Sequence, residues 1–287
     1  MKIFILLLVL SLLPVFQVWA QGDGCVRARK IYRRGVQTRD YGEKAQLYAS
    51  AVRACPGYAA AHNNLADAFE RLGRLQRAEK HYRIASKLKP VLAVSHFGLG
   101  DVLRKRRKFK EAITAYQKGL KLMPIDDLAR KGLAQARASL PAGHPMQLIS
   151  AGEISRQFSR IKQMGVGGTR RGGISFQNIL FATGSAEILP GSRPQLDEIA
   201  KAITPLTRER GMRFRVVGHT DSTGSLHFNM KLSSLRAKSV IRYLTKRQGV
   251  SGAHLRSMGK GPNQPLVSNS TENGRRINRR VEVVIDE

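Results

Sequence analysis

The sequence predicts a chain of two parts, in which a stack of helical hairpins is joined by a linker to an α/β domain whose helices cover one face of a small mixed sheet. Pro56, Pro90 and Pro124 recur every 34 residues, a period typical of stacked helical hairpins. After residue 173, strand-like and helical patterns alternate, and the stretch before it is rich in Pro, Gly and Arg, which is typical of a linker. We therefore expect three regions: helical repeats at 21–140, a linker at 141–173 and the α/β domain at 174–287.

The first 20 residues, MKIFILLLVLSLLPVFQVWA, have the pattern of a secretory signal peptide cleaved after Ala20. A membrane anchor is the alternative, because the apolar stretch is only just short of a spanning length. Pro14, Gln17 and the absence of basic residues directly after the stretch favour cleavage. The mature protein is therefore expected outside the cytoplasm.

An oxidising location favours pairing of the two cysteines, Cys25 and Cys55. They lie at neighbouring ends of the first predicted hairpin, so a disulfide between them is geometrically reasonable. Two buried free thiols are the alternative.

Each predicted hairpin has small residues where two helices must cross closely, such as Ala66 and Ala78, and proline after its second helix. This pattern resembles the tetratricopeptide repeat over about residues 57–124, and the first unit fits only in its second half. A last helix within 125–140 is expected to cover the final apolar face. The resemblance implies a groove that binds a protein partner, here an unidentified envelope protein. Its candidate groove residues are Asn63, Asp67, Arg71, Phe97, Asp101 and Arg104.

The predicted linker contains one short helix. Ser150 and Glu153 form a capping-box pattern. Ile154, Phe158 and Ile161 follow at helical spacing and form an apolar face. We expect this helix to pack on one of the two domains, and the GVGG segment after it to be a connector rather than a phosphate-binding loop.

The α/β domain is expected to contain strands at 174–181, 212–219, 254–261 and 279–286. A first helix is expected at 192–203, capped by Ser192. A second helix is expected to begin with Ser233 as its N-cap and to end at Gly249. The residues of the second helix that we expect to face inward are Leu235, Val240, Ile241 and Leu244.

Asp221 and Arg236 form the candidate binding site. Asp221 lies in the turn TDSTG after a predicted strand, and Arg236 lies one turn into the helix expected to begin at Ser233. An arginine there leans back toward the helix N-terminus, so the two side chains can reach the same place. Opposite charges held side by side match a zwitterion, whose ammonium binds the aspartate and whose carboxylate binds the arginine. A weak surface ion pair is the alternative.

The segment GHTDSTGSLHFNMKLSSLRAKSV, followed by GRRINRRVEVVI, resembles the OmpA-like peptidoglycan-binding domain over about residues 174–287. The resemblance implies noncovalent binding of the peptidoglycan stem peptide, with Asp221 on the side-chain amine of meso-diaminopimelate and Arg236 on its carboxylate. It also implies a wall-associated protein of the periplasm, with association with the outer membrane left open. The supporting residues implied are Thr220, Asn229, Leu232, Arg280 and, from the loop after the first strand, Thr183.

Nothing in the sequence assembles a catalytic or metal site. Ser222 lies near His219 and Asp221, but no nucleophile elbow or pair of acid–base carboxylates accompanies them. His219 and His227 lack a third metal ligand. We expect a non-catalytic protein without metal or cofactor.

Charge supports an alternative function. The chain has 50 Lys and Arg against 20 Asp and Glu, a formal charge of +30. The excess is larger on the repeats, +16 over 21–140 against +9 over 177–287, and includes the run RKRRKFK at 104–110. The chain could therefore bind anionic polymer, lipid or nucleic acid by charge alone, although export disfavours nucleic acid. Salt separates the two functions, because charge-driven binding weakens steeply as salt rises.

Overall fold

The computed structural model describes residues 13–140, 148–164 and 172–286, with side chains from Asp23 onward. Within it the chain divides into two compact units between Val102 and Leu103. Residues 1–12 of the predicted signal peptide and the GVGG connector lie outside the described residues. Both remain predictions, as do the boundaries expected for the domains.

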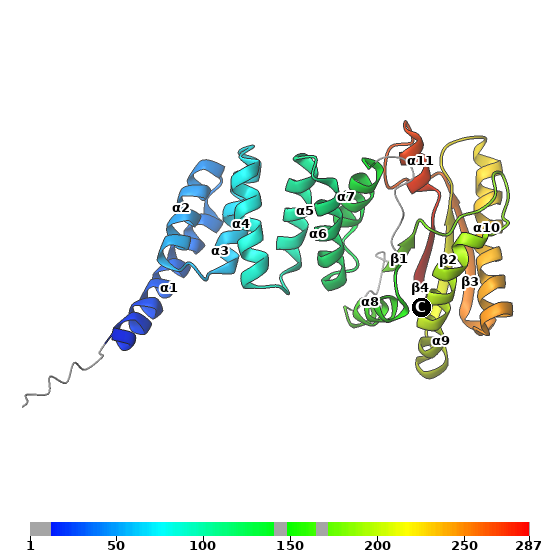
Figure 1. Cartoon of the computed structure of the whole chain (residues 1–287), viewed down its shortest axis with the longest axis horizontal. Coiled ribbons are helices and arrows are strands. Elements are labelled where there is room, and N and C mark those ends of the chain that lie inside the picture. The colour runs from blue at the N-terminus through cyan, green and yellow to red at the C-terminus, as the bar shows by residue number, and fades with distance from the viewer. Residues whose placement is uncertain (1–12, 141–147, 165–171, 287) are drawn as a thin grey trace, which may run out of the picture. The chain divides into compact units, whose positions relative to one another are not determined.

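The first unit consists of antiparallel helical hairpins (Figure 1). Its helices are α1 (Leu13–Gln37), α2 (Tyr41–Ala54), α3 (Ala59–Arg71), α4 (Leu75–Leu88) and the larger part of α5 (Ala93–Lys105). Gly98 lies so close to the ring of Tyr82 that a Cβ there would stand 2.3 Å from it. The same contact recurs in the second unit between Gly132 and Tyr116. Helices can cross at this distance only where one of them lacks a side chain.

A histidine ties the start of each of two repeats to the preceding proline. His62 Nε2 lies 3.1 Å from Pro56 O, and His96 Nε2 lies 2.9 Å from Pro90 O. Because a carbonyl only accepts, each Nε2 carries the proton. His62 Nδ1 then accepts from His81 Nδ1, 2.9 Å away.

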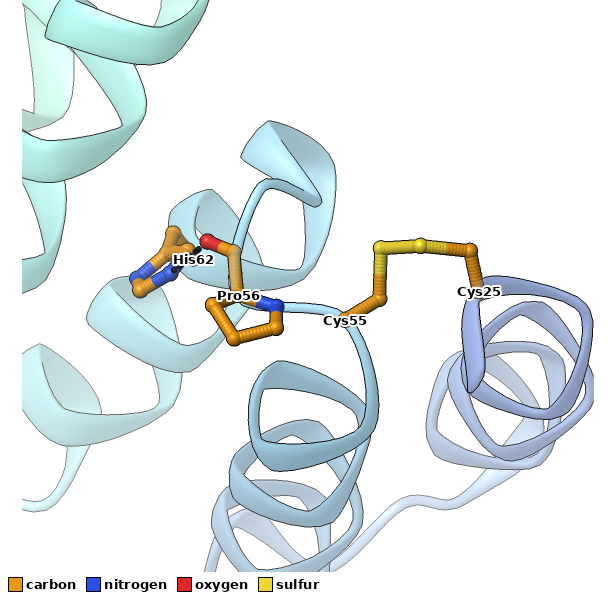
Figure 2. Close-up of a disulfide and its surroundings, with 4 residues drawn as sticks. All are labelled: Cys25, Cys55, Pro56 and His62. Atoms are coloured by element: carbon orange, nitrogen blue, oxygen red, sulfur yellow. Dashed lines mark hydrogen bonds between the residues drawn. A yellow bond between two sulfur atoms is a disulfide. The ribbon is translucent and has the colours of Figure 1, made fainter. Parts of the chain in front are cut away.

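A disulfide joins Cys25 of α1 to Cys55, the residue that ends α2 (Figure 2). The next residue, Pro56, accepts the hydrogen bond from His62 of α3, so one short segment links three helices. Ala28, Ala51, Cys55 and Ala61 form a small buried cluster beside it. A cluster so poor in large side chains contributes little burial energy, and a covalent link offsets that lack.

We predict that the double variant Cys25→Ser/Cys55→Ser unfolds its first hairpin more easily. Opening a loop with a sequence separation of 30 removes about 3 to 4 kcal/mol in the chain-entropy description. Urea unfolding followed by circular dichroism measures this loss. Dithiothreitol should reproduce it in the wild type and leave the variant unchanged, whereas equal stability of oxidised and reduced wild type would contradict the prediction.

The second unit combines two further helices of the repeat region with the α/β domain. Its elements are α6 (Phe109–Leu122), α7 (Asp127–Ala138), α8 (Ala151–Gln163), β1 (Gly173–Phe176), α9 (Arg193–Arg210), β2 (Arg213–His219), α10 (Leu226–Gln248), β3 (Leu255–Gly261), α11 (Glu272–Asn278) and β4 (Val281–Asp286). The strand order is β1-β4-β2-β3. β4 is antiparallel to β1 and β2, while β2 and β3 are parallel. The predicted fold class, helical repeats followed by helices on a small mixed sheet, is therefore confirmed.

Helix α8 packs on the α/β domain. Ser150 caps it by accepting from Glu153 N at 3.4 Å. Its predicted apolar residues, Ile154, Phe158 and Ile161, are all buried against the core of the sheet domain. The Phe158 ring lies 4.9 Å from that of Phe214 on β2. The capping pattern and the apolar spacing therefore predicted both this helix and its buried face.

Two expectations for the start of the domain are wrong. The strand expected at 174–181 ends at Phe176. Ser192 does not cap α9 with its side chain; its hydroxyl instead accepts from Leu180 N at 2.6 Å and donates to Leu180 O at 3.0 Å. The backbone after β1 instead pairs with residues 187–189, through Leu189 N to Leu180 O at 3.0 Å and a single antiparallel bridge between Phe181 and Ile188.

The expected start of α10 is also wrong. The helix begins at Leu226, with Ser225 accepting from Phe228 N at 3.2 Å, so Ser225 and not Ser233 is the N-cap. Gly224, with φ of +90°, makes the turn before it. The earlier start sets the phase of the buried face, which includes Val240 and Leu244, and leaves Leu235 42% exposed. Gly249 ends the helix with φ of 69°.

Candidate functional site

The site lies where α10 crosses the ends of β2 and β3. A Cβ on Gly218 of β2 would stand 2.2 Å from Ser233 O, and one on Gly259 of β3 would stand 2.6 Å from Ser233 Oγ. The Ser233 hydroxyl, fully buried, accepts from Gly261 N at 2.9 Å and donates to Met230 O at 2.9 Å. Only glycine permits so close an approach, and the approach fixes α10 relative to the turn that follows β2.

Asp221 lies in that turn and is only 7% exposed. Its Oδ1 accepts from Thr223 N at 2.8 Å, and its Oδ2 accepts from Arg279 Nη1 at 2.6 Å. Burial alone would raise the pKa of Asp221, but the hydrogen bonds from Arg279 and Thr223 outweigh it and hold that pKa below its usual value. The carboxylate is therefore ionised at neutral pH.

Arg236 lies in the third turn of α10 and is also 7% exposed. Its Nε donates to Ser185 O at 2.9 Å, and its guanidinium lies 5.0 Å from the centre of the Phe181 ring. Burial and the charge of Arg279 lower the pKa of Arg236, while the charge of Asp221 raises it. Asp221 and Arg236 thus interact electrostatically. The carbonyl and the ring hold the guanidinium in place without neutralising it.

Three of the other candidate residues lie around this pair. Asn229, on the first turns of α10, donates to Thr223 O at 2.9 Å and so fastens the turn to the helix. The Thr220 backbone donates to Gly261 O at 3.0 Å, while its buried hydroxyl has no hydrogen-bond partner among the described residues. Leu232 is buried at 8% exposure.

Thr183 and Arg280 have different surroundings. Thr183 is exposed, and the contact from its loop to Arg236 comes from the carbonyl of Ser185. Arg280 is 4% exposed and donates to Glu282 Oε1 at 2.8 Å and to Gln264 O at 3.1 Å. The arginine that contacts Asp221 is Arg279, whereas the side chain of Arg280 is bound to Glu282 and Gln264.

Sequence reasoning missed Arg279 and the backbone carbonyl of Ser185. A partial signal for the first was present, because neighbouring side chains of an extended segment point to opposite sides. Arg279 is extended and directly precedes Arg280, so only one of the two can face Asp221. No signal pointed to the carbonyl of Ser185, since any residue type supplies one.

The six candidate groove residues of the repeats have mixed surroundings. Ser95 Oγ donates to Asn63 Oδ1 at 2.8 Å, and Asp67 lies 3.7 Å from Arg71 in an exposed ion pair. Phe97 is buried at 8% exposure. Arg104 contacts the hydroxyl of Tyr116 at 3.4 Å. Asp101 is half-buried and contributes to the raised pKa of Tyr82.

None of the described helices is long and apolar enough to cross a membrane. The described His, Cys, Asp and Glu side chains form no group of three or more that could hold a metal ion.

Comparison with known families identifies the two parts of the chain. The model of the OmpA family matches residues 180–279, which include Asp221, Arg236 and Arg279. Residues 180–279 are an OmpA-family domain. Models of the tetratricopeptide repeat match residues 36–91 and 93–126. The predicted resemblance to both families is therefore confirmed.

Relatives of the OmpA-family domain are envelope proteins. Over 108 residues, or 38% of this chain, it is 38% identical to probable lipoprotein YiaD of Escherichia coli, of which the match covers 48%. The peptidoglycan-binding protein ArfA of Mycobacterium tuberculosis is 38% identical over 108 residues, which cover 38% of this chain and 32% of that protein. The chain thus spans less than half the length of either relative. The solved cell wall anchor of the T6SS from Pseudomonas aeruginosa is 29% identical, with a TM-score of 0.35, over 46% of this chain and 95% of that one.

We predict that the pKa of the Asp221 carboxyl depends on Arg279. In a carbon-detected NMR titration it should lie below the ordinary aspartate value in the wild type and rise in Arg279→Gln, because the variant loses the charged hydrogen bond. Since the pKa is lowered by folding, the carboxylate stabilises the fold above the unfolded pKa, and this contribution is lost as the pH falls through the folded value. Arg275→Gln is the matched control on α11, and an equal rise in that variant would refute the role of Arg279.

Proposed function

We propose that this protein binds peptidoglycan noncovalently, with Asp221 and Arg236 holding the ammonium and the carboxylate of meso-diaminopimelate in the stem peptide. The observation that carries the proposal is that an OmpA-family domain holds these two opposite charges, each only 7% exposed, where they interact across the turn and α10. The relative ArfA is named a peptidoglycan-binding protein, which supports peptidoglycan as the ligand.

The Asp221 carboxylate retains capacity for an ammonium. It accepts hydrogen bonds from the backbone and side chain of Thr223 and from Arg279, whereas an ionised carboxylate offers about four acceptor positions. Arg279 is paired with both Asp221 and Glu272, whereas Arg236 forms no ion pair among the described residues. A ligand that brings an ammonium to Asp221 should therefore also bring a carboxylate to Arg236. Diaminopimelate does both.

Arg236 is suited to that carboxylate. Only its Nε is used, toward Ser185 O, and among the described residues its two terminal Nη groups make no hydrogen bond. A guanidinium fixed through Nε offers those two groups in the geometry of a planar carboxylate. The bond to Ser185 therefore orients the arginine and leaves its binding edge unused.

We further propose that the domain acts by binding alone, as a scaffold in the envelope, and that the repeats recruit a protein partner. The proposed site contains a turn aspartate paired with Arg279 and an arginine, Arg236, oriented by a backbone carbonyl, a set suited to recognition rather than to acyl transfer. The basic composition of the repeats favours an acidic partner. Export to the periplasm, with the chain associated with the wall, fits this role.

We predict that Asp221→Ala and Arg236→Ala each weaken peptidoglycan binding at least tenfold, on the order of the loss expected when one member of a buried charged contact is removed. Sedimentation of the folded proteins with purified sacculi measures this. Glu209→Ala and Arg242→Ala remove one exposed charge of each sign outside the site and should sediment like the wild type. Unchanged sedimentation of both site variants would exclude the site.

The salt dependence of peptidoglycan binding distinguishes this proposal from binding by net charge. In the proposed site Asp221 and Arg236 bind one positive and one negative group of the ligand, so we expect sedimentation to persist between 50 and 200 mM salt. Over the same range, charge-driven binding to a polyanion falls by about 10³-fold or more. A comparable fall here would favour the charge-driven alternative.

A further inference from the structure

A second feature of the same unit is a cavity of about 560 Å³. It lies where α6, α7 and α8 meet the sheet domain, far along the chain from the turn of Asp221. Its walls include the apolar side chains of Leu120, Leu133 and Ile174 and three arginines, Arg130, Arg137 and Arg280. A volume of this size suits a small ligand.

Arg130 and Arg137 are seven residues apart on α7 and therefore lie on one face of that helix. Both are held by neutral oxygens of the sheet domain. Arg130 donates to the backbone carbonyl of Gly173, and Arg137 Nη1 donates to Gln177 Oε1 at 2.6 Å. Each contact orients its guanidinium, and neither supplies a negative charge.

The carboxylates around the cavity are paired with, or act on, cations other than Arg137. Glu282 pairs with Arg280 at 2.8 Å, and Glu153 pairs with Lys121 at 3.0 Å. Asp127 stabilises the charge of Arg130, together with Glu282. Among the described residues, no carboxylate forms an ion pair with Arg137.

A charge of the same sign acts on Arg137. Burial and the charge of Arg276 on α11 lower the pKa of Arg137 to about 10. The Nε of Arg276 is itself buried with no hydrogen-bond partner among the described residues. Both arginines are half-buried, and the charge of Glu272 acts on Arg276. Arg137 has no carboxylate partner among the described residues and a like charge acting on it, which favours an anion that is not part of the chain.

We propose that this cavity binds a small ligand through a carboxylate or phosphate group, with Arg137 as its main contact and Arg130 beside it. A guanidinium fork matches both of these groups. The apolar walls then take the uncharged part of the ligand. The site is separate from the peptidoglycan site and does not depend on it.

The test uses inorganic phosphate and succinate as probes on the full-length protein, with sodium chloride adjusted to equal ionic strength. Titrations followed by calorimetry and by ¹⁵N–¹H NMR should show saturable binding of at least one probe, with shifts concentrated on α7. Arg137→Gln should weaken that binding by about tenfold or more, because a charged bidentate contact is lost. Arg137→Lys keeps the positive charge but loses the bidentate guanidinium geometry, so it should weaken probe binding less. It replaces Arg137→Gln as the test if that variant does not fold.

Two matched controls keep the outcome decisive. Arg208→Gln removes an exposed arginine at the end of α9, and Arg236→Ala removes the carboxylate contact of the proposed peptidoglycan site; both should bind the probes like the wild type. Absence of saturable binding by the wild type, or equal binding by Arg137→Gln, would overturn the proposal. Loss of probe binding in Arg236→Ala would do so as well, by assigning the anion to the other site.

Discussion

The close crossing of α10 over β2 and β3 is the constraint on which the proposed site depends. Two strands bring glycine, Gly218 and Gly259, to the point where Ser233 passes, and the Ser233 hydroxyl bonds the backbone of Gly261. This contact fixes a helix against the end of a sheet with little freedom to slide. Asp221 follows one strand and Arg236 lies on the helix, so their relative position is set by backbone packing.

The charges of the site are balanced by contacts that leave capacity for a ligand. Arg279 keeps Asp221 ionised, and a backbone carbonyl orients Arg236 without neutralising it. Such preorganisation reduces the ordering that binding would otherwise require. Two arginines of α7, Arg130 and Arg137, are likewise held by neutral oxygens. They line a separate cavity, for which we propose a second ligand.

Sequence reasoning predicted the fold well where a period or a motif extended over many residues. The spacing of Pro56, Pro90 and Pro124 located the repeats, and the capping pattern at Ser150 located α8. Sequence reasoning gave a wrong helix start where two residues were equally suited to be the N-cap. Ser225 and Ser233 are both favoured N-caps, and only the turn at Gly224 decides between them. Asp221 and Arg236 were found from their local motif, but Arg279 lies 58 residues from Asp221. Alternation along an extended segment separates Arg279 from Arg280 but does not say which of them contacts Asp221.

The central claim is that the protein recognises both the ammonium and the carboxylate of the diaminopimelate side chain. Lysine tests this claim because its side chain has the ammonium but lacks the carboxylate. Calorimetry should therefore compare muropeptides that contain meso-diaminopimelate with otherwise identical ones that contain lysine. We expect the wild type to bind the lysine form about tenfold or more weakly, and Arg236→Ala to bind both forms alike. Equal affinity of the wild type for the two muropeptides would contradict the account.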